Sequence, residues 1–275
     1  MTLNVLEIKL GEYMIFITGD IHGDPARFSE DEFPVQNEMT REDYVIICGD
    51  FGMLWSQKEN KEENDQLDWL NGRNFTTLFI DGNHENFDRL NALPVRSWHG
   101  GNVHFVREHI IHLMRGEIFE LNGTSVFAFG GARSHDIAGL ASDEELARDY
   151  TAGILQKDDP HLYGKLKLVR NYYSSARIEN QDWWRAEMPT QAEMDAGLEN
   201  LKKHDMKVDF IVSHDGPISD LVLLGGGITA DPLNKYFEEL RQKVTYRKWF
   251  FGHHHEDRRI NDRETAIYYS IMQVE

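Results

Sequence analysis

The sequence predicts an α/β fold built around a layered sheet. Three short apolar runs rich in β-branched and aromatic residues, at residues 15–17, 44–48 and 75–80, are typical of buried strands. Between the second and third runs, residues 62–70 place Leu67 and Leu70 on one face of a predicted helix and acidic residues opposite. Strand, helix and strand in alternation favour a sheet covered by helices. Ligands of such sheets bind outside the carboxyl ends of the strands.

The other strands are predicted from shorter apolar runs. Residues 1–12 are expected to form a short edge strand, and residues 24–42 a short helix and a loop. Residues 102–129 contain four further runs separated by turn residues, including the hairpin signal Asn122-Gly123. The remaining strands are expected at residues 208–212, 249–251 and 267–274.

Two further helices carry clear N-terminal signals. Thr190 and Glu193 have the spacing of a capping box before a helix with apolar residues at positions 194, 198 and 201. Asp231 and Pro232 suit the N-cap and first turn of a helix that runs to about Val244.

Residues 135–185 interrupt this pattern with charged and aromatic residues. The segment contains no clean linker and no repeat, so we expect one domain over residues 1–275 with an insertion at 135–185. The insertion is expected to be a lid over the site or a subsidiary packing element. Its aromatic residues Tyr172, Tyr173 and Trp183 could stack on a base, but packing in a small core is the favoured interpretation.

The composition limits the partners of the chain. The 275 residues include 29 Lys and Arg against 47 Asp and Glu, which gives a net charge of −18 and disfavours binding of long duplex nucleic acid. The single cysteine, Cys48, excludes an internal disulfide. There is no signal-peptide core and no apolar run long enough to span a membrane. We therefore expect a soluble cytoplasmic protein without a membrane partner.

Side chains of metal-binding type follow five of the predicted strands. They are Asp20 and His22 after the first strand, Asp50 after the second, Asn83 and His84 after the third, then His214, and finally His253 and His255. Each alone has an ordinary alternative as a turn residue or a surface histidine. In an extended chain Asp20 and His22 would point the same way, as would His253 and His255, whereas His254 would point away into solvent. The repetition at five strand ends favours a metal site.

The order and spelling of these motifs resemble the calcineurin-like metallophosphoesterase family over nearly the whole chain. The family pattern is Asp-x-His, Gly-Asp, Gly-Asn-His-Glu/Asp, a later His and then Gly-His-x-His, and this sequence spells all five blocks from Gly19 to His255. The resemblance implies a sandwich of two β-sheets flanked by helices. It also implies a site with two metal ions.

The resemblance assigns a role to each matching residue. Asp20, His22 and His255 would hold the first metal, Asp50 would bridge both metals, and Asn83, His214 and His253 would hold the second. His84 would stand outside the metals as the general acid for the leaving group. Such a mixed set of nitrogen and oxygen ligands suits two divalent transition metals, with manganese favoured and iron or zinc as alternatives.

The implied function is hydrolysis of a phosphomonoester or phosphodiester by a hydroxide that bridges the two metals, without a covalent enzyme intermediate. The alternative is a catalytically silent metal-binding or nucleotide-binding regulatory protein, which is disfavoured because every ligand position is filled. A structural zinc protein is disfavoured by the single cysteine. The sequence leaves the oligomeric state open.

One departure from the resemblance concerns the substrate. The Ser/Thr phosphatases of the superfamily carry Asp-Arg-Gly shortly after Gly-Asp, whereas residues 49–55 here contain no arginine. We therefore expect a small phosphoester or a nucleotide rather than a phosphoprotein as substrate. Arg133, on a glycine-rich turn, is the candidate replacement for binding phosphate, and a surface arginine is the equally strong alternative.

Overall fold

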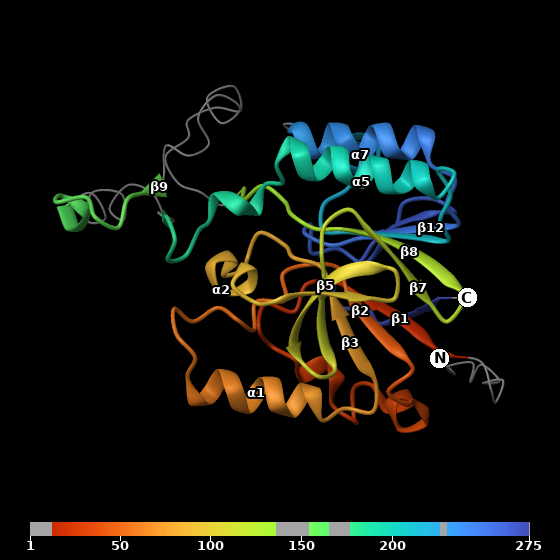
Figure 1. Cartoon of the computed structure of the whole chain (residues 1–275), viewed down its shortest axis with the longest axis horizontal. Coiled ribbons are helices and arrows are strands. Elements are labelled where there is room, and N and C mark those ends of the chain that lie inside the picture. The colour runs from red at the N-terminus through yellow and green to blue at the C-terminus, as the bar shows by residue number, and fades with distance from the viewer. Residues whose placement is uncertain (1–12, 136–153, 165–176, 226–229, 275) are drawn as a thin grey trace.

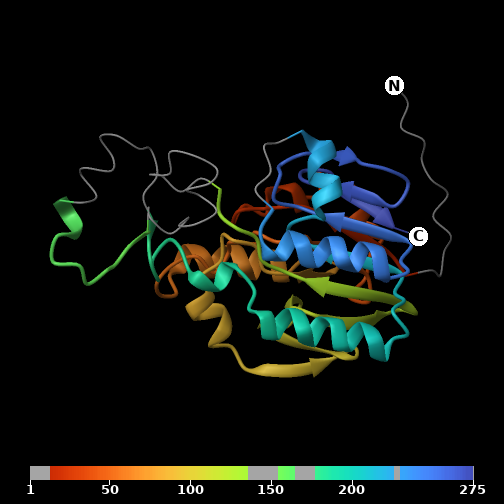
Figure 2. The same ribbon diagram turned by 90° about the horizontal axis from the view of Figure 1, so that it is seen from above.

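The computed structural model describes residues 13–135, 154–164, 177–225 and 230–274. Within them two β-sheets lie face to face between two layers of helix, as the sequence and the family resemblance predicted (Figure 1). Helix α1 (Lys61–Asn71) covers one sheet, and helices α5 (Gln191–Lys203) and α7 (Pro232–Lys243) cover the other. Figure 2 shows α5 and α7 side by side over their sheet.

The first sheet has seven strands in the described part of the chain. Its order is β15 (Met272–Val274), β1 (Ile15–Thr18), β2 (Tyr44–Ile47), β3 (Thr76–Phe79), β6 (Ile110–Leu113), β5 (Gly101–Arg107) and β4 (Val95–Trp98). Strands β1, β2, β3 and β6 are parallel, with Ile15 beside Tyr44 and Tyr44 beside Thr76. Their carboxyl ends therefore lie at one edge of the sheet.

The second sheet has six strands among the described residues and repeats this arrangement. Its order is β13 (Arg258–Arg259), β14 (Glu264–Ala266), β12 (Lys248–Phe251), β11 (Phe210–Ser213), β8 (Thr124–Phe129) and β7 (Glu117–Leu121). Strands β8, β11, β12 and β14 are parallel. The smaller elements are α2 (Phe87–Asn91), α6 (Ile218–Leu224), the pair β9 (Ile154–Leu155) and β10 (Arg177–Ile178), and 3₁₀ helices at Ala26–Phe28, Pro34–Glu38 and Arg185–Glu187.

Alternation along the strands divides the apolar residues among three cores. In β1, Ile15 and Ile17 face the core between the two sheets, whereas Phe16 faces the core under α1 with Leu67 and Leu70. The third core lies between the second sheet and helices α5 and α7. Because both faces of β1 are covered, the strand reads as a continuous apolar run, as expected for a parallel sheet.

The two predicted N-terminal signals are confirmed. Thr190 and Glu193 form a reciprocal capping box at the start of α5, and Asp231 caps α7 with Pro232 in its first turn. The short elements β4, α2 and α6 were not predicted. Residues 24–42 contain two 3₁₀ helices in place of the single short helix that was expected.

The C-terminal strand is shorter than predicted, because only Met272–Val274 pairs with β1. The backbone N–H groups of Tyr268, Tyr269 and Ser270 donate to the carboxylate of Asp257 instead of to a neighbouring strand. This local capping keeps the backbone between β14 and β15 out of the sheet. The edge strand expected at residues 1–12 lies outside the described residues.

The predicted insertion is described only in part, and Tyr172 and Tyr173 lie outside the described residues. Residues 154–164 extend to one side of the body in both views (Figures 1 and 2). Trp183 and Trp184 are buried, with 1% and 2% of their surfaces exposed, in agreement with the packing interpretation. The single-domain assignment and the lid remain predictions. Among the described residues, no helix combines the length and apolar character needed to cross a membrane.

Gly19 lies where the end of β1 meets the segment that follows β14. Its N–H donates to the carbonyl oxygen of Tyr268 over 3.1 Å, and a Cβ at this position would lie 2.2 Å from the carbonyl oxygen of Ile267. The three nearest atoms all belong to the backbone of Ile267 and Tyr268, so no flexible side chain could move away. The contact between the two sheets therefore requires glycine here.

We expect Gly19→Ala to lower the free energy of unfolding by about 1–3 kcal/mol, because the new methyl group overpacks a backbone contact. This loss corresponds to a decrease in Tm of several degrees, measured by calorimetry on the metal-free protein. Gly164→Ala is the matched control, since a Cβ there would meet nothing within 4 Å. Equal Tm values for the two variants would contradict the assigned contact.

Candidate metal centre

The predicted site residues gather at the carboxyl ends of parallel strands from both sheets. The loops after β1, β2 and β3 carry Asp20, His22, Asp50, Asn83 and His84, and the loops after β11 and β12 carry His214, His253 and His255. Groups of carboxylate and imidazole ligand atoms lie within 4.8 Å of one another across these loops. The structure therefore brings the residues of five separate sequence motifs together.

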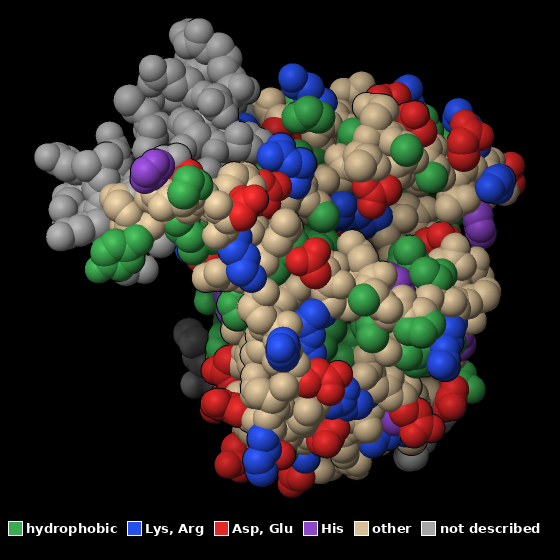
Figure 3. Space-filling model, turned by 60° about the vertical axis from the view of Figure 1, so that its left-hand side comes forward, with side chains coloured by type: hydrophobic (Ala, Val, Ile, Leu, Met, Phe, Trp, Pro, Cys, Tyr) green, Lys and Arg blue, Asp and Glu red, His purple; other side chains and the backbone are tan. Residues whose placement is uncertain are grey.

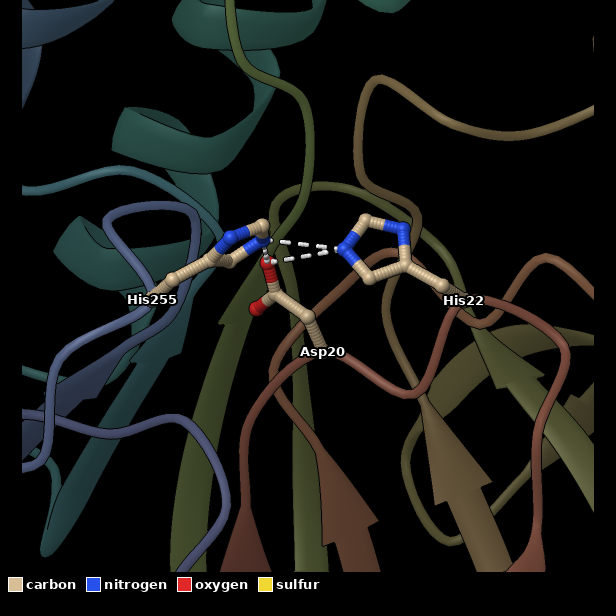
Figure 4. A group of neighbouring side chains, drawn as sticks. All are labelled: Asp20, His22 and His255. Carbon is tan, nitrogen blue, oxygen red and sulfur yellow. Dashed lines mark hydrogen bonds and ion pairs between the residues drawn. The ribbon is translucent and has the colours of Figure 1, made fainter.

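The first group is formed by Asp20, His22 and His255 (Figure 4). The Nε2 atoms of His22 and His255 are 2.9 Å apart, and His255 Nε2 is 3.2 Å from Asp20 Oδ2. Only one of two neutral imidazole nitrogens can hold a proton between them. A cation, in contrast, can accept both lone pairs together with the carboxylate oxygen.

Asp50 lies between this group and the loops after β3 and β11. Its Oδ1 accepts a hydrogen bond from the backbone N–H of His84 over 2.7 Å and lies 3.3 Å from His214 Nε2. Its Oδ2 lies 3.8 Å from His22 Nδ1. This central position suits a carboxylate that bridges two ions. His84 also belongs to a group of candidate ligands with His22 and Asp50, so its place outside the metals remains a prediction.

His214 has its ring orientation fixed by the end of β2. Its Nδ1 donates to the carbonyl oxygen of Cys48 over 2.8 Å, and a carbonyl can only accept, so the proton resides on Nδ1. Its Nε2 then faces Asn83 Oδ1 at 3.1 Å. The ring of His253 lies 5.1 Å from that of His214, and the ring of His135 lies 5.0 Å beyond it.

The charges of the site favour the binding of cations. Burial alone would lower the pKa of His214, but the carboxylates of Asp50 and Asp20 raise it to about 10. Burial alone would raise the pKa of Asp50, but His214, His84 and His22 hold it below its usual value. For His253, burial is the main cause of a pKa lowered to about 3, so its ring is neutral and can act as a ligand.

The backbone at the site is not extended, which corrects the geometric argument made from the sequence. His22, Asp50, His253 and His255 have φ angles of 46°, 46°, 67° and 51°, all in the left-handed region. Asp20 and His22 thus approach each other through a turn and not through strand alternation. Such strained backbone is typical of functional sites.

His254 is half-buried and not solvent-exposed as predicted. Its Nε2 is 2.9 Å from Oδ1 of the buried residue Asp215, whose Oδ2 accepts from Asn234 at the start of α7. Burial alone would raise the pKa of Asp215, but the hydrogen bond with His254 lowers it. His254 therefore anchors the histidine loop from behind and lies outside the candidate ligand groups among the described residues.

Two buried acids support the site, and sequence reasoning assigned a role to neither. Glu187 accepts a hydrogen bond from Ser134 Oγ over 2.6 Å. The same Oγ accepts from Asn83 Nδ2 over 3.3 Å. The amide of Asn83 is thereby oriented so that its Oδ1 faces His214. Glu85 accepts from the N–H groups of Phe51 and Gly52, directly after Asp50. Both acids align donor atoms that come from other loops.

Three aromatic side chains contact the predicted site residues, and these contacts were not predicted from the sequence. Trp55 lies beside His84, His135 beside His253, and Tyr268 is stacked on His255 with ring centroids 4.5 Å apart. The sequence indicated only that Trp55 lies shortly after the Gly-Asp block, and it did not indicate where the ring would point. Burial raises the pKa of Asp231 to about 6, and the nearby charge of Arg133 opposes this increase. Arg133 itself is half-buried. Its role in phosphate binding remains a prediction.

Glu85→Gln tests whether the turn after Asp50 supports the ligand set. Burial and the nearby charge of Asp50 raise the pKa of Glu85, whereas the hydrogen bonds from the backbone N–H groups of Gly52 and Phe51 lower it. The amide has only one acceptor atom, so one of the two hydrogen bonds is lost. We expect the affinity for Mn²⁺ to fall about 10- to 100-fold, measured by competition with a chelator. Glu62→Gln, on the exposed face of α1, is the control; equal metal affinities would contradict the supporting role.

Comparison with known proteins agrees with this geometry. The sequence matches the model of the calcineurin-like phosphoesterase family over residues 13–257. It is also 25% identical over 199 residues to a lariat debranching enzyme from Schizosaccharomyces pombe (strain 972 / ATCC 24843), an alignment that covers 68% of this chain. The chain spans about a third of that relative, 34% of its length. With its motifs gathered at one edge of two facing sheets and the family match over most of its length, the chain belongs to the calcineurin-like phosphoesterase family.

Proposed function

We propose that this chain hydrolyses a phosphomonoester or phosphodiester at a centre of two divalent transition metals, with His84 as general acid. The observation that carries the proposal is the convergence of His22 Nε2, His255 Nε2 and Asp20 Oδ2 around one point, with Asp50 as their neighbour. The family supports a metal-dependent phosphoesterase activity. The two-metal arrangement and the roles of single residues are our inference.

The donor set fits the proposed metals. Imidazole nitrogens, carboxylate oxygens and one amide oxygen suit manganese, iron or zinc, and manganese is our first choice. Asp20, His22 and His255 would hold one ion, Asn83, His214 and His253 the other, and Asp50 would bridge them. Bound there, the two ions would activate water and supply positive charge to the phosphoryl group.

The chain's own residues would then direct the reaction. His84 is half-buried, and its backbone N–H donates to Asp50, which holds it beside the proposed bridging ligand. We place its ring beside the leaving oxygen of a bound substrate. It would give that oxygen a proton as the bond to phosphorus breaks. Arg133 would add a positive charge for the phosphate, in place of the arginine missing after Asp50.

The substrate is proposed to be a small phosphoester or a nucleotide. On the face shown in Figure 3, Lys and Arg side chains are interspersed with Asp and Glu side chains and form no broad basic surface. The net charge of −18 also opposes binding of long duplex nucleic acid. The buried free thiol of Cys48 agrees with the proposed cytoplasmic location. A catalytically silent binding protein is the alternative, and turnover by the metal-loaded chain would exclude it.

The metal content of the protein tests the two-metal proposal. We expect the purified, reconstituted protein to hold two transition-metal ions per chain, measured by elemental analysis. Asp50→Asn should reduce this number to one or fewer, because the amide cannot supply two negative oxygens to a bridge. Asp65→Asn on α1 is the control and should keep both ions. One ion or none in the unaltered protein would refute the two-metal proposal.

The variant His84→Asn distinguishes a general acid from a metal ligand at this position. We expect His84→Asn to keep both metals and to lower kcat about 10²- to 10⁴-fold. The loss should be largest for substrates with poor leaving groups, because their oxygen depends most on the proton. Rates are compared over a series of aryl and alkyl phosphoesters, with metal content measured on the same samples. Release of a metal ion from His84→Asn would instead identify His84 as a ligand.

A further inference from the structure

Trp55 lies at the rim of the site, next to the residue proposed as general acid. The centroids of the Trp55 and His84 rings are 6.1 Å apart, with an angle of 49° between their planes. All six tryptophans lie in the described residues, and Trp55 has the largest exposure, with 36% of its surface accessible. Its neighbours Met53 and Leu54 are buried. A large apolar ring is thus presented to solvent at the functional site.

The loop that carries Trp55 is held in place by hydrogen bonds to its backbone. Asn86 Nδ2 donates to the carbonyl oxygens of Trp55 and Ser56 over 3.2 Å and 3.1 Å. Arg89 donates to the carbonyl oxygens of Leu54 and Ser56 and pairs with the buried carboxylate of Glu63 at 2.6 Å. The ring is therefore positioned before a ligand arrives, which reduces the entropy lost on binding.

A second tryptophan supports Trp55 from the interior. Trp184 contacts it edge-to-face with ring centroids 5.6 Å apart, and the buried Trp184 indole donates to Asp88 over 3.0 Å. The Trp55 ring is thus braced on one side by packing and remains accessible on another. This is the arrangement of an aromatic stacking surface rather than of a core residue.

We propose that Trp55 is the stacking surface for the leaving group, and that the preferred substrate carries a nucleobase on the alcohol that is released. This inference rests on the proposed function, because the general acid must lie beside the leaving oxygen, and Trp55 lies beside the general acid. Stacking on a base is independent of charge, so an acidic chain can bind a nucleotide in this way without a basic groove. Trp55 would determine specificity, whereas the metals and His84 perform the reaction.

The bond changes balance without another reactant. A water oxygen bonds to phosphorus while the bond from phosphorus to the nucleoside oxygen breaks. The bonding electron pair stays on the nucleoside oxygen, which takes a proton from His84. The attacking water releases a proton to solvent. His84 takes up a proton from solvent, so the net number of protons is unchanged and the site returns to its starting state. The products are the free nucleoside and phosphate, or a phosphate monoester when the substrate is a diester.

Adenosine 5′-phosphate and ribose 5-phosphate test the proposal, because they share the same leaving oxygen and differ only in the base. Their methyl diesters extend the comparison to diester hydrolysis. With the manganese-loaded protein we expect kcat/KM to favour the compounds with a base about 10- to 100-fold. Trp55→Ala should bring this ratio close to one through a higher KM for the compounds with a base. Trp55→Leu keeps apolar bulk without an aromatic face and should behave in the same way, and Trp98→Phe on β4 should keep the original ratio.

Binding by calorimetry separates failure of this inference from failure of the proposed function. If no compound is hydrolysed, the proposed activity fails, but the inference still requires tighter binding of adenosine 5′-phosphate than of ribose 5-phosphate in the unaltered protein and not in Trp55→Ala. Equal binding of the two compounds by the unaltered protein would overturn the inference. A fall in kcat by the same factor on both compounds in Trp55→Ala, with the ratio kept, would also overturn it and show that Trp55 only positions His84.

Discussion

The buried carboxylate of Asp50 is the contact on which the rest of the site depends. It accepts from the backbone N–H of His84 and lies within 4 Å of the rings of His22 and His214. The backbone carbonyl oxygen of Asp50 accepts from the N–H groups of Ile21 and His22. One residue thus joins the loops that follow β1, β2, β3 and β11, and in this way links the two sheets at their shared edge. Although burial alone would raise the pKa of the Asp50 carboxyl, the neighbouring His214, His84 and His22 explain why it is lowered.

This arrangement has a cost in backbone conformation that the surroundings must offset. Asp50 has a φ of 46°, which is unfavourable for a residue with a side chain, and a Cβ on Gly82 would come within 2.0 Å of its Oδ1. Glu85 fixes the next two N–H groups and so keeps the turn in this conformation. The Gly-Asn-His-Glu block therefore serves two purposes. It supplies candidate donors to the site and supports the turn that presents Asp50.

The end of the predicted insertion and the 3₁₀ helix Arg185–Glu187 contribute to the site. Glu187 fixes Ser134, which orients the amide of Asn83, and Trp184 braces Trp55 beside His84. A segment far along the chain thus aligns groups on the loops after β2 and β3. This contribution depends on burial, since both Trp184 and Glu187 are almost completely excluded from solvent.

The sequence by itself determined the layered α/β class, the strands that lead into the site and the chemical type of the donors. Apolar runs that end in Gly, Asp and His are local signals, and strand β1 with Asp20 or β12 with His253 could be located from them. The family resemblance added the second sheet, and it also assigned the donors to two metal ions, which remains a prediction. Only the tertiary structure decided how the donors meet, because their contacts join residues such as His22 and His255, which are 233 positions apart. It also replaced strand alternation by left-handed turns, placed His254 against Asp215 and brought Trp55 to His84. These features depend on packing and on long-range hydrogen bonds, and neither leaves a periodic pattern in the sequence.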